Sequence, residues 1–263
     1  MNKILNASVG FGAGFAGGLI GLGGAELRLP YLVGVAGLTP HQAVPVNLAV
    51  SLATILAAIP IRALALDAPA VAQHLTEVFA IALGAVILAY LGVGWLRRMS
   101  PALLSKVIFV LLVALGVSLL AEAFVPLVSD GFLPQIVALR AAAGLAFGAA
   151  IGTISSVLGV AGGEVIIPTL VFAYGIDIKT AGTLSLLISV PTVLIGIARH
   201  AKHGAFRDTQ RNVALIVPMA LGSIAGAILG GLAAGFFPSS AIKLILGVLL
   251  IWSAWKVFGH ASR

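Results

Sequence analysis

Apolar runs long enough to cross a lipid bilayer recur along the whole chain, and this feature constrains the fold more than any other. A hydrocarbon core of about 30 Å needs about 20 helical residues. Of the 263 residues, 60% are hydrophobic and 9% are charged, and the mean hydropathy is +1.17. The sequence therefore predicts an all-α polytopic membrane protein, with one transmembrane domain over 1–263. The apolar segments cover about residues 4–22, 27–38, 41–61, 76–96, 102–124, 137–157, 164–174, 178–198, 211–234 and 239–258.

An internal repeat divides these segments into two sets of five. The stretch GLGGAELRLPYLVGVAGL at 21–38 aligns without a gap on GVAGGEVIIPTLVFAYGI at 159–176. We therefore expect repeat one over 1–124, a linker over 125–136 and repeat two over 137–263. The second segment of each set is too short to span a bilayer. Because it follows a Gly-rich turn, it predicts a short broken or re-entrant helix.

Capping residues predict where the third segment of each set begins. Thr39 and Gln42 match a capping box with Pro40 at the first helical position, and Asp177 is the corresponding cap in repeat two. Glycines at every fourth position predict that some helices approach one another closely. These rows are Gly10, Gly14 and Gly18; Gly144, Gly148 and Gly152; and Gly222, Gly226 and Gly230.

Lys and Arg near the segment ends predict the orientation of the loops. The stretches 96–106 and 199–211 are rich in them, whereas 122–136 has none and 62–75 has only Arg62. Equivalent loops of the two repeats are thus predicted on opposite sides of the membrane, with both termini cytoplasmic. Such inverted-topology repeats bind substrate near the bilayer midplane, between discontinuous helices. The Lys and Arg of the two basic stretches are Arg97, Arg98, Lys106, Arg199, Lys202, Arg207 and Arg211.

Several functional classes are disfavoured by composition and motifs. The formal net charge of +7 does not indicate a nucleic-acid partner, because the basic residues lie at segment ends. The chain has no cysteine and no pattern typical of a metal or cofactor site, so we expect no cofactor. An intramembrane hydrolase is disfavoured because neither GxSxG nor HExxH occurs. A secondary transporter fits best, and a transporter or channel for another small ion is the alternative.

The repeated motifs resemble the TauE/SafE family of membrane permeases, also called the sulfite exporter or toluene-sulfonate uptake group. The resemblance rests on GLGGAE, LRLPYL and GLTPHQAVPVNLAVSLAT in one copy, and on GVAGGEVIIPTL and IDIKTAGTLSLLISVPT in the other. It implies a permease in the cell (inner) membrane that moves sulfite, organosulfonates or related small sulfur-containing anions, usually outward. The oligomeric state is not predicted. Many members have an aliphatic residue at the position of Arg28, and repeat two of this chain has Ile166 there.

The Gly-rich turns are the first candidate site. Gly23 and Gly24 in one copy, and Gly162 and Gly163 in the other, let backbone amides point into a cavity where a short helix begins, and the helix dipole there favours an anion. The alternative is that these glycines only permit a tight, closely packed turn.

Charged residues in the short helices are the second candidate. Glu26 and Glu164 are equivalent, and we expect them either to carry coupled protons or to offset the helix dipole in the first turn. Arg28 lies deep in a short helix and needs a partner there. That partner is either Glu26 or a sulfonate-like anion, which matches the guanidinium fork.

Polar residues in the third segment are the last candidate. They recur at helical spacing in both copies, so each trio lies on one face near mid-membrane. They either line the substrate site or bond to their own helix and its neighbours. The trios are Asn47, Ser51 and Thr54, and Ser185, Ser189 and Thr192.

Overall fold

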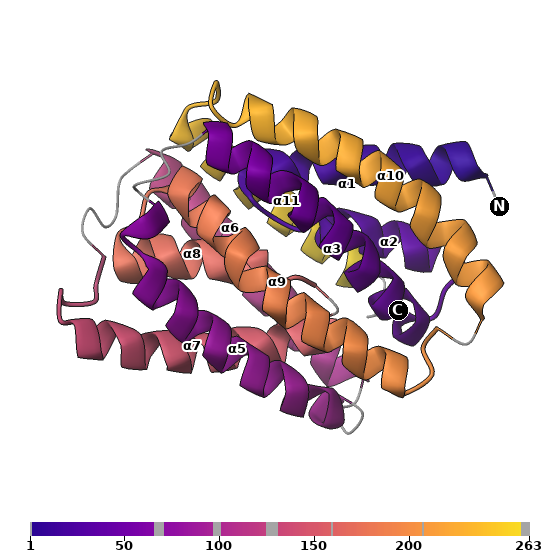
Figure 1. The fold of residues 1–263 in the computed structure, drawn as a ribbon, viewed down its shortest axis with the longest axis horizontal. Coiled ribbons are helices and arrows are strands. Elements are labelled where there is room, and N and C mark those ends of the chain that lie inside the picture. The colour runs from indigo at the N-terminus through magenta and orange to yellow at the C-terminus, as the bar shows by residue number, and fades with distance from the viewer. Residues whose placement is uncertain are drawn as a thin grey trace.

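A computed structural model describes residues 2–65, 71–96, 101–124, 131–158, 160–206 and 208–258. These parts form helices and turns without strands, which confirms the all-α prediction (Figure 1). The helices are α1 (Lys3–Ile20), α2 (Ala25–Gly34), α3 (Pro40–Ala65), α5 (Leu75–Leu96), α6 (Pro101–Phe124), α7 (Val137–Leu158), α8 (Gly163–Tyr174), α9 (Ile178–Lys202), α10 (Thr209–Ala233) and α11 (Ser239–Phe258).

Five of the described helices are long and apolar enough to cross a membrane, namely α1, α3, α7, α9 and α10. Helices α2 and α8 have only 10 and 12 residues, as predicted for the short segments. The loop residues Arg97, Arg98 and Arg207 lie outside the described residues. The inverted orientation of the two repeats and the cytoplasmic termini stay predictions.

Both predicted caps of the third segments are present. The backbone N–H of Thr39 donates to Oε1 of Gln42 at 3.2 Å, which is the reciprocal contact of a capping box. The Asp177 carboxylate accepts from the backbone N–H of Lys179 at 2.9 Å and of Thr180 at 3.3 Å. These contacts satisfy amides that have no partner within the helix, so α3 and α9 begin where the sequence predicts.

The glycine rows bring pairs of helices into backbone contact, as predicted. A Cβ added at Gly14 would lie against the carbonyl of Ser223 in α10, and one at Gly226 would lie against the carbonyl of Phe11 in α1. In the same way, Gly148 of α7 lies against Ile81 of α5. The rows therefore form two tight interfaces, α1 with α10 and α5 with α7.

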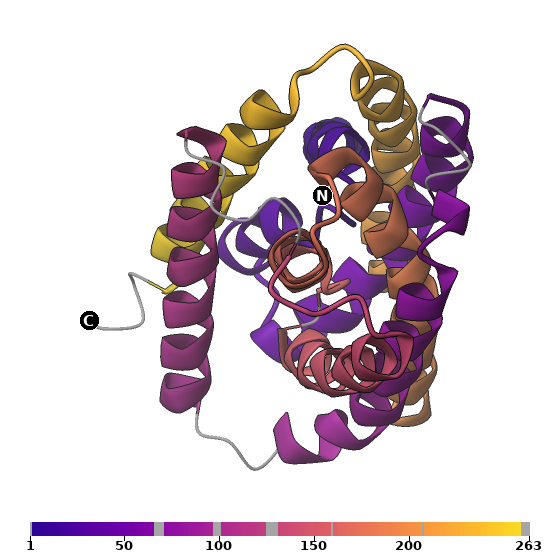
Figure 2. The same cartoon turned by 90° about the vertical axis from the view of Figure 1, so that its left-hand side faces the viewer.

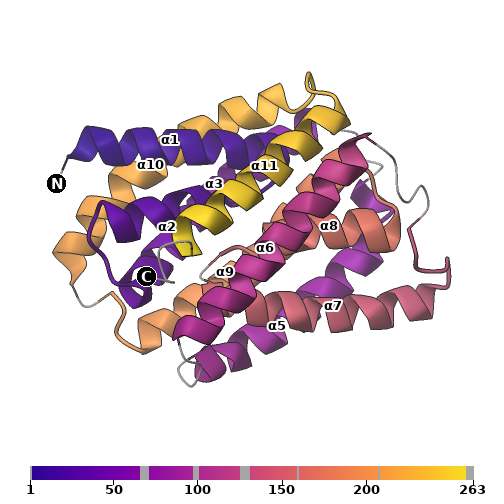
Figure 3. The ribbon, with the colours of Figure 1, turned by 180° about the vertical axis from the view of Figure 1, so that it is seen from behind.

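These pairs join the two predicted repeats to each other. The first helix of each repeat packs along the fourth helix of the other, while the third helices, α3 and α9, contact each other between these pairs (Figure 1). The last helices, α6 and α11, pair on one side of the bundle (Figure 2), where α11 contacts α2 and α6 contacts α8 (Figure 3). This pairing between the first and second half of the chain places α2 and α8 inside the bundle.

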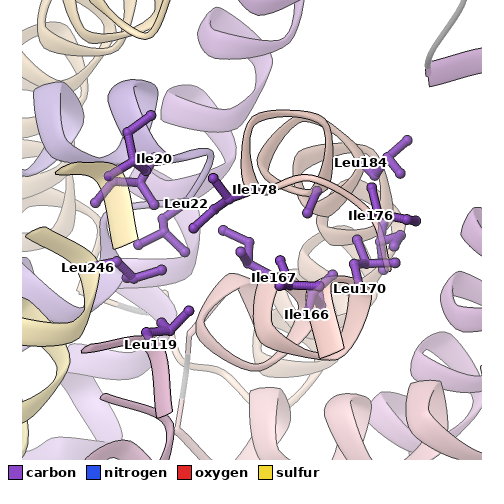
Figure 4. Packing of buried hydrophobic residues seen from close by; sticks show 14 of the residues in the cluster. Ile20, Leu22, Leu119, Ile166, Ile167, Leu170, Ile176, Ile178, Leu184 and Leu246 are labelled. Atoms are coloured by element: carbon purple, nitrogen blue, oxygen red, sulfur yellow. The ribbon is translucent and has the colours of Figure 1, made fainter. Parts of the chain in front are cut away.

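The largest buried apolar cluster surrounds the two Gly-rich turns. It joins Ile20 at the end of α1 and Leu22 in the following turn to Ile166 and Ile167 of α8 and to Leu246 of α11 (Figure 4). Apolar contacts between the repeats thus hold both turns in a water-poor environment, where a polar group needs a partner within the protein.

Arg62 is not a loop residue, and that prediction is wrong, because α3 extends past it and its side chain is fully buried. Its guanidinium donates to the carbonyl oxygens of Gly18, Leu19 and Lys179, each at 2.8 Å, and to Oγ1 of Thr183 at 3.2 Å. Arg62 therefore gives hydrogen-bond partners to the last turn of α1 and ties it to α9. No Lys or Arg remains between this residue and position 75, so the predicted charge difference between the loops is kept.

Candidate functional site

The two Gly-rich turns cross in direct contact inside the bundle. Gly24 (φ 68°) and Gly162 (φ 85°) adopt left-handed conformations immediately before α2 and α8, a backbone geometry that glycine adopts without strain. A Cβ at Gly23 would lie 2.9 Å from Cβ of Ala161, and one at Gly163 would lie 2.7 Å from the side chain of Leu22. The ends of the two short helices therefore meet at one place, which supports the close-packing interpretation of the glycines.

Arg28 lies beside this crossing, and its side chain is fully buried. Its Nε donates to the amide oxygen of Asn47 at 3.2 Å. Its Nη1 donates to Oγ1 of Thr54 and to Oγ of Ser223, both at 3.2 Å. Its Nη2 donates to Oγ of Ser51 at 2.6 Å and to the carbonyl oxygen of Gly23 at 2.5 Å.

These five hydrogen bonds use all five N–H donors of the guanidinium, and every acceptor is neutral. Glu26 acts on Arg28 through electrostatics, and none of these five hydrogen bonds goes to it. A buried cation of this kind favours an anion nearby, because Coulomb attraction is strong where water is excluded.

Repeat two shows the same site without the arginine. Ile166 occupies the position of Arg28 and is also fully buried. There the hydroxyl of Ser189 donates directly to the carbonyl of Ala161, at 2.8 Å. Ser51 and Gly23 are the equivalents of this pair in repeat one, and Arg28 donates to both. In repeat one the guanidinium thus binds both the hydroxyl and the carbonyl that bond directly to each other in repeat two, and it adds a positive charge there.

The remaining members of the second polar trio also bond to backbone carbonyls. Ser185 donates to the carbonyl of Gly21, in the other repeat, at 2.5 Å, and Thr192 bonds back to Ile188 in its own helix at 3.1 Å. The structure therefore brings the first trio together around Arg28, whereas Ser185 and Ser189 of the second trio fix the turns.

Glu26 and Glu164, the equivalent carboxyls of the two short helices, meet at the crossing. They are 8% and 3% exposed, and their side chains lie within hydrogen-bonding reach of each other. Glu164 also accepts from its own backbone N–H, the contact that the helix-capping interpretation predicts. Its Oε1 is buried and has no hydrogen-bond partner among the described residues. The two carboxyls therefore lie close enough to share one proton in a hydrogen bond.

A small cavity of about 10 Å³ lies next to Glu26. Its walls come from α1, α2 and α11 and are apolar apart from that carboxyl; they include Gly17, Leu27, Leu246 and Leu250. A space of this size is close to the minimum for one water molecule. The turns therefore leave little free volume at the crossing in this conformation.

Ser223 is a site residue that the sequence-based reasoning missed. It comes from α10, 195 residues after Arg28, and also donates to the carbonyl of Gly10 at 2.9 Å. A signal was available, because Ser223 is the only polar side chain in the middle of an otherwise apolar helix. No cluster of metal-ligating side chains is found among the described residues.

One comparison with known proteins gives a match. A family model described as "Sulfite exporter TauE/SafE" matches residues 5–206 and residues 143–263, which together cover nearly the whole chain. No curated protein and no solved structure matches.

Proposed function

Because the chain belongs to the sulfite exporter TauE/SafE family of membrane transporters, we propose that it moves sulfite, organosulfonates or related small sulfur-containing anions out of the cell by alternating access. The family is one of transporters and not of enzymes, and the apolar helices make this chain a multi-pass membrane protein. In the proposed arrangement, repeats 1–124 and 137–263 have opposite orientations in the cell membrane, both termini are cytoplasmic, and the halves rock about the crossing of the turns.

The observation that carries this proposal is the fully buried guanidinium of Arg28 surrounded by neutral acceptors. A charge near the middle of a membrane protein is costly and marks a functional site by default. A sulfonate group matches the guanidinium fork, so it can replace two of the hydroxyl acceptors by charge-assisted bonds. The hydroxyls of Ser51 and Thr54 can then donate to the same anion, because a hydroxyl is both donor and acceptor.

The rest of the proposed site surrounds this group. Asn47 orients the guanidinium, and the left-handed turns at Gly24 and Gly162 direct the positive ends of α2 and α8 toward the crossing. Gly23 and Gly163 let the turns touch. Ser185 holds the first turn and Ser189 the second, and both complete the lining with Thr192 when the halves separate. Glu26 and Glu164 carry the coupled proton.

Labelled sulfite flux into proteoliposomes tests the proposal, with and without a pH gradient. We expect saturable flux that organosulfonates inhibit. Arg28→Ile, which copies the residue of repeat two, should lower the flux about 100-fold, because two charge-assisted bonds to the anion are lost. Arg62→Lys is the matched control, since it alters a second fully buried arginine that lies outside the proposed site.

Two results would count against the proposal. Parent protein without saturable flux would exclude sulfite transport, and Arg28→Ile with parental flux would exclude Arg28 from the site. Counterflow separates a carrier from a channel for another small ion, because only a carrier exchanges labelled internal anion for unlabelled external anion.

A further inference from the structure

We infer that this site accepts only singly charged anions and takes up one proton with each of them. The inference rests on the proposed function, and it concerns the charge of the substrate and the number of protons that accompany it. It follows from the charges that meet at the crossing of the two turns.

Three ionisable side chains meet at this crossing. Arg28 supplies one positive charge, and Glu26 and Glu164 are the carboxyls beside it. Other acidic and basic side chains of the helices packed against α2 and α8 lie within the first or last six residues of those helices. Arg62 is the other fully buried arginine of the described residues, and its own donors are bound to carbonyls and a hydroxyl near the end of α3. The balance at the crossing thus depends on Arg28 and two carboxyls.

In the anion-free state these three groups are neutral together. The carboxyls of Glu26 and Glu164 lie within hydrogen-bonding reach of each other, and such a bond requires one proton between two oxygens. The pair then carries a single negative charge, which balances the positive charge of Arg28. A neutral group of charges is what a nearly water-free site inside the membrane requires.

Binding of an anion changes this balance by its full charge. A singly charged anion restores neutrality if the carboxyl pair takes one proton from water and becomes uncharged. An unpartnered carboxyl oxygen is available within the pair, because Oε1 of Glu164 is buried and has no hydrogen-bond partner among the described residues. The loaded site then holds Arg28 with one positive charge, the anion with one negative charge and two neutral carboxyls.

A doubly charged anion cannot be balanced in the same way. After the pair has taken its last proton, no further carboxylate remains at the crossing, so one negative charge stays uncompensated. An uncompensated charge at this depth disfavours binding by at least about fiftyfold. The site therefore selects a monoanion such as bisulfite or an alkyl sulfonate against a dianion such as sulfate. Transport of the neutral set carries no net charge.

Proteoliposomes loaded with a pH-sensitive dye test the inference directly. Labelled sulfite flux is measured with methanesulfonate or sulfate as competitor, and an imposed membrane potential is varied separately from the pH gradient. We expect inhibition by methanesulfonate at a concentration at least about fiftyfold lower than by sulfate. Protons are counted during flux of labelled methanesulfonate, because sulfite itself gains and loses a proton near neutral pH. We expect one proton per methanesulfonate and a flux that the potential leaves unchanged.

Carboxyl variants give a second, independent test. Glu26→Gln and Glu164→Gln each leave one carboxyl to balance Arg28, so each single variant keeps one proton per anion. The double variant has none, so its flux loses the proton and becomes sensitive to the membrane potential. Glutamine keeps the size of the side chain and its ability to accept and donate hydrogen bonds, and size-exclusion profiles check that each variant folds.

The outcomes distinguish failure of the inference from failure of the proposed function. Saturable sulfite flux together with equal inhibition by sulfate and methanesulfonate would overturn the inference and leave the proposed function in place. A proton count other than one, or a double variant that keeps its proton, would do the same. Absence of saturable flux for both labelled sulfite and labelled methanesulfonate would overturn the proposed function and the inference built on it.

Discussion

Replacing Ser51 by alanine should cost far more stability than replacing its repeat equivalent, Ser189. Both hydroxyls are buried, and both sit at the same point of the third segment of their repeat. Ser51 accepts a 2.6 Å hydrogen bond from the guanidinium of Arg28, whereas Ser189 donates a 2.8 Å bond to a neutral carbonyl. The two substitutions therefore remove the same atom from environments that differ chiefly in one positive charge.

The expected magnitudes follow from this difference. Loss of a hydrogen bond to a charged group costs about 1.5–3 kcal/mol, and more is lost when the partner stays buried without an acceptor. Neutral hydrogen bonds between membrane helices average about 0.6 kcal/mol. We therefore expect Ser51→Ala to lower the free energy of unfolding by about 1–2 kcal/mol more than Ser189→Ala.

Unfolding of the purified protein in mixed micelles of increasing denaturing-detergent fraction measures both variants. The same pair is then measured in the Arg28→Ile background, where the excess cost of Ser51→Ala should disappear, because no charged donor remains. This double-mutant cycle isolates the interaction between the two residues. Equal costs for the two serines, or an excess that persists without the arginine, would refute the assignment of Arg28 as the source.

Other predictions concern helix packing, the buried Arg62 and acid stability. Gly148→Ala should destabilise the protein by about 1–3 kcal/mol, because its Cβ would meet the α5 backbone, whereas Gly12→Ala has open space and should be neutral or better; thermal unfolding compares them. Arg62→Ala should lower the unfolding temperature more than Arg62→Lys, because three buried carbonyls lose their donor. Burial lowers the pKa of His74, so the unfolded chain binds the proton first as pH falls below about 6.5. The unfolding temperature should therefore drop more between neutral and acidic pH in the parent than in His74→Gln, and identical pH profiles would contradict this.

Local features of the sequence predicted much of the fold. The caps at Gln42 and Asp177 and the glycine rows act over one or two helical turns, so their patterns can be read directly. The sequence did not predict which helices pack against each other. The glycine row predicts that Gly148 lies close to another helix, but no neighbouring residue indicates that this contact is with Ile81.

In the candidate site too, contacts within one helix face were predicted from the sequence, whereas contacts between distant helices were not. Helical spacing placed Asn47, Ser51 and Thr54 on one face, and the structure brings all three to Arg28. Ser223 was not predicted, because it reaches the guanidinium from another helix of the other repeat. The sequence repeat shows that Glu26 and Glu164 are equivalent. Their contact with each other depends on the crossing of the turns, which the sequence did not predict.

The pairing of helices that lie far apart in the sequence has a consequence for biosynthesis. Helix α1 is complete at residue 20, but its main partner, α10, begins only at residue 209. Helix α1 therefore stays in the membrane without this partner while the nearly 190 residues between the two helices are made. Its exposed glycine row stays open to wrong partners during that time, including the same helix of a neighbouring nascent chain. A half-length chain would lack this partner altogether, so correct assembly depends on late events in synthesis.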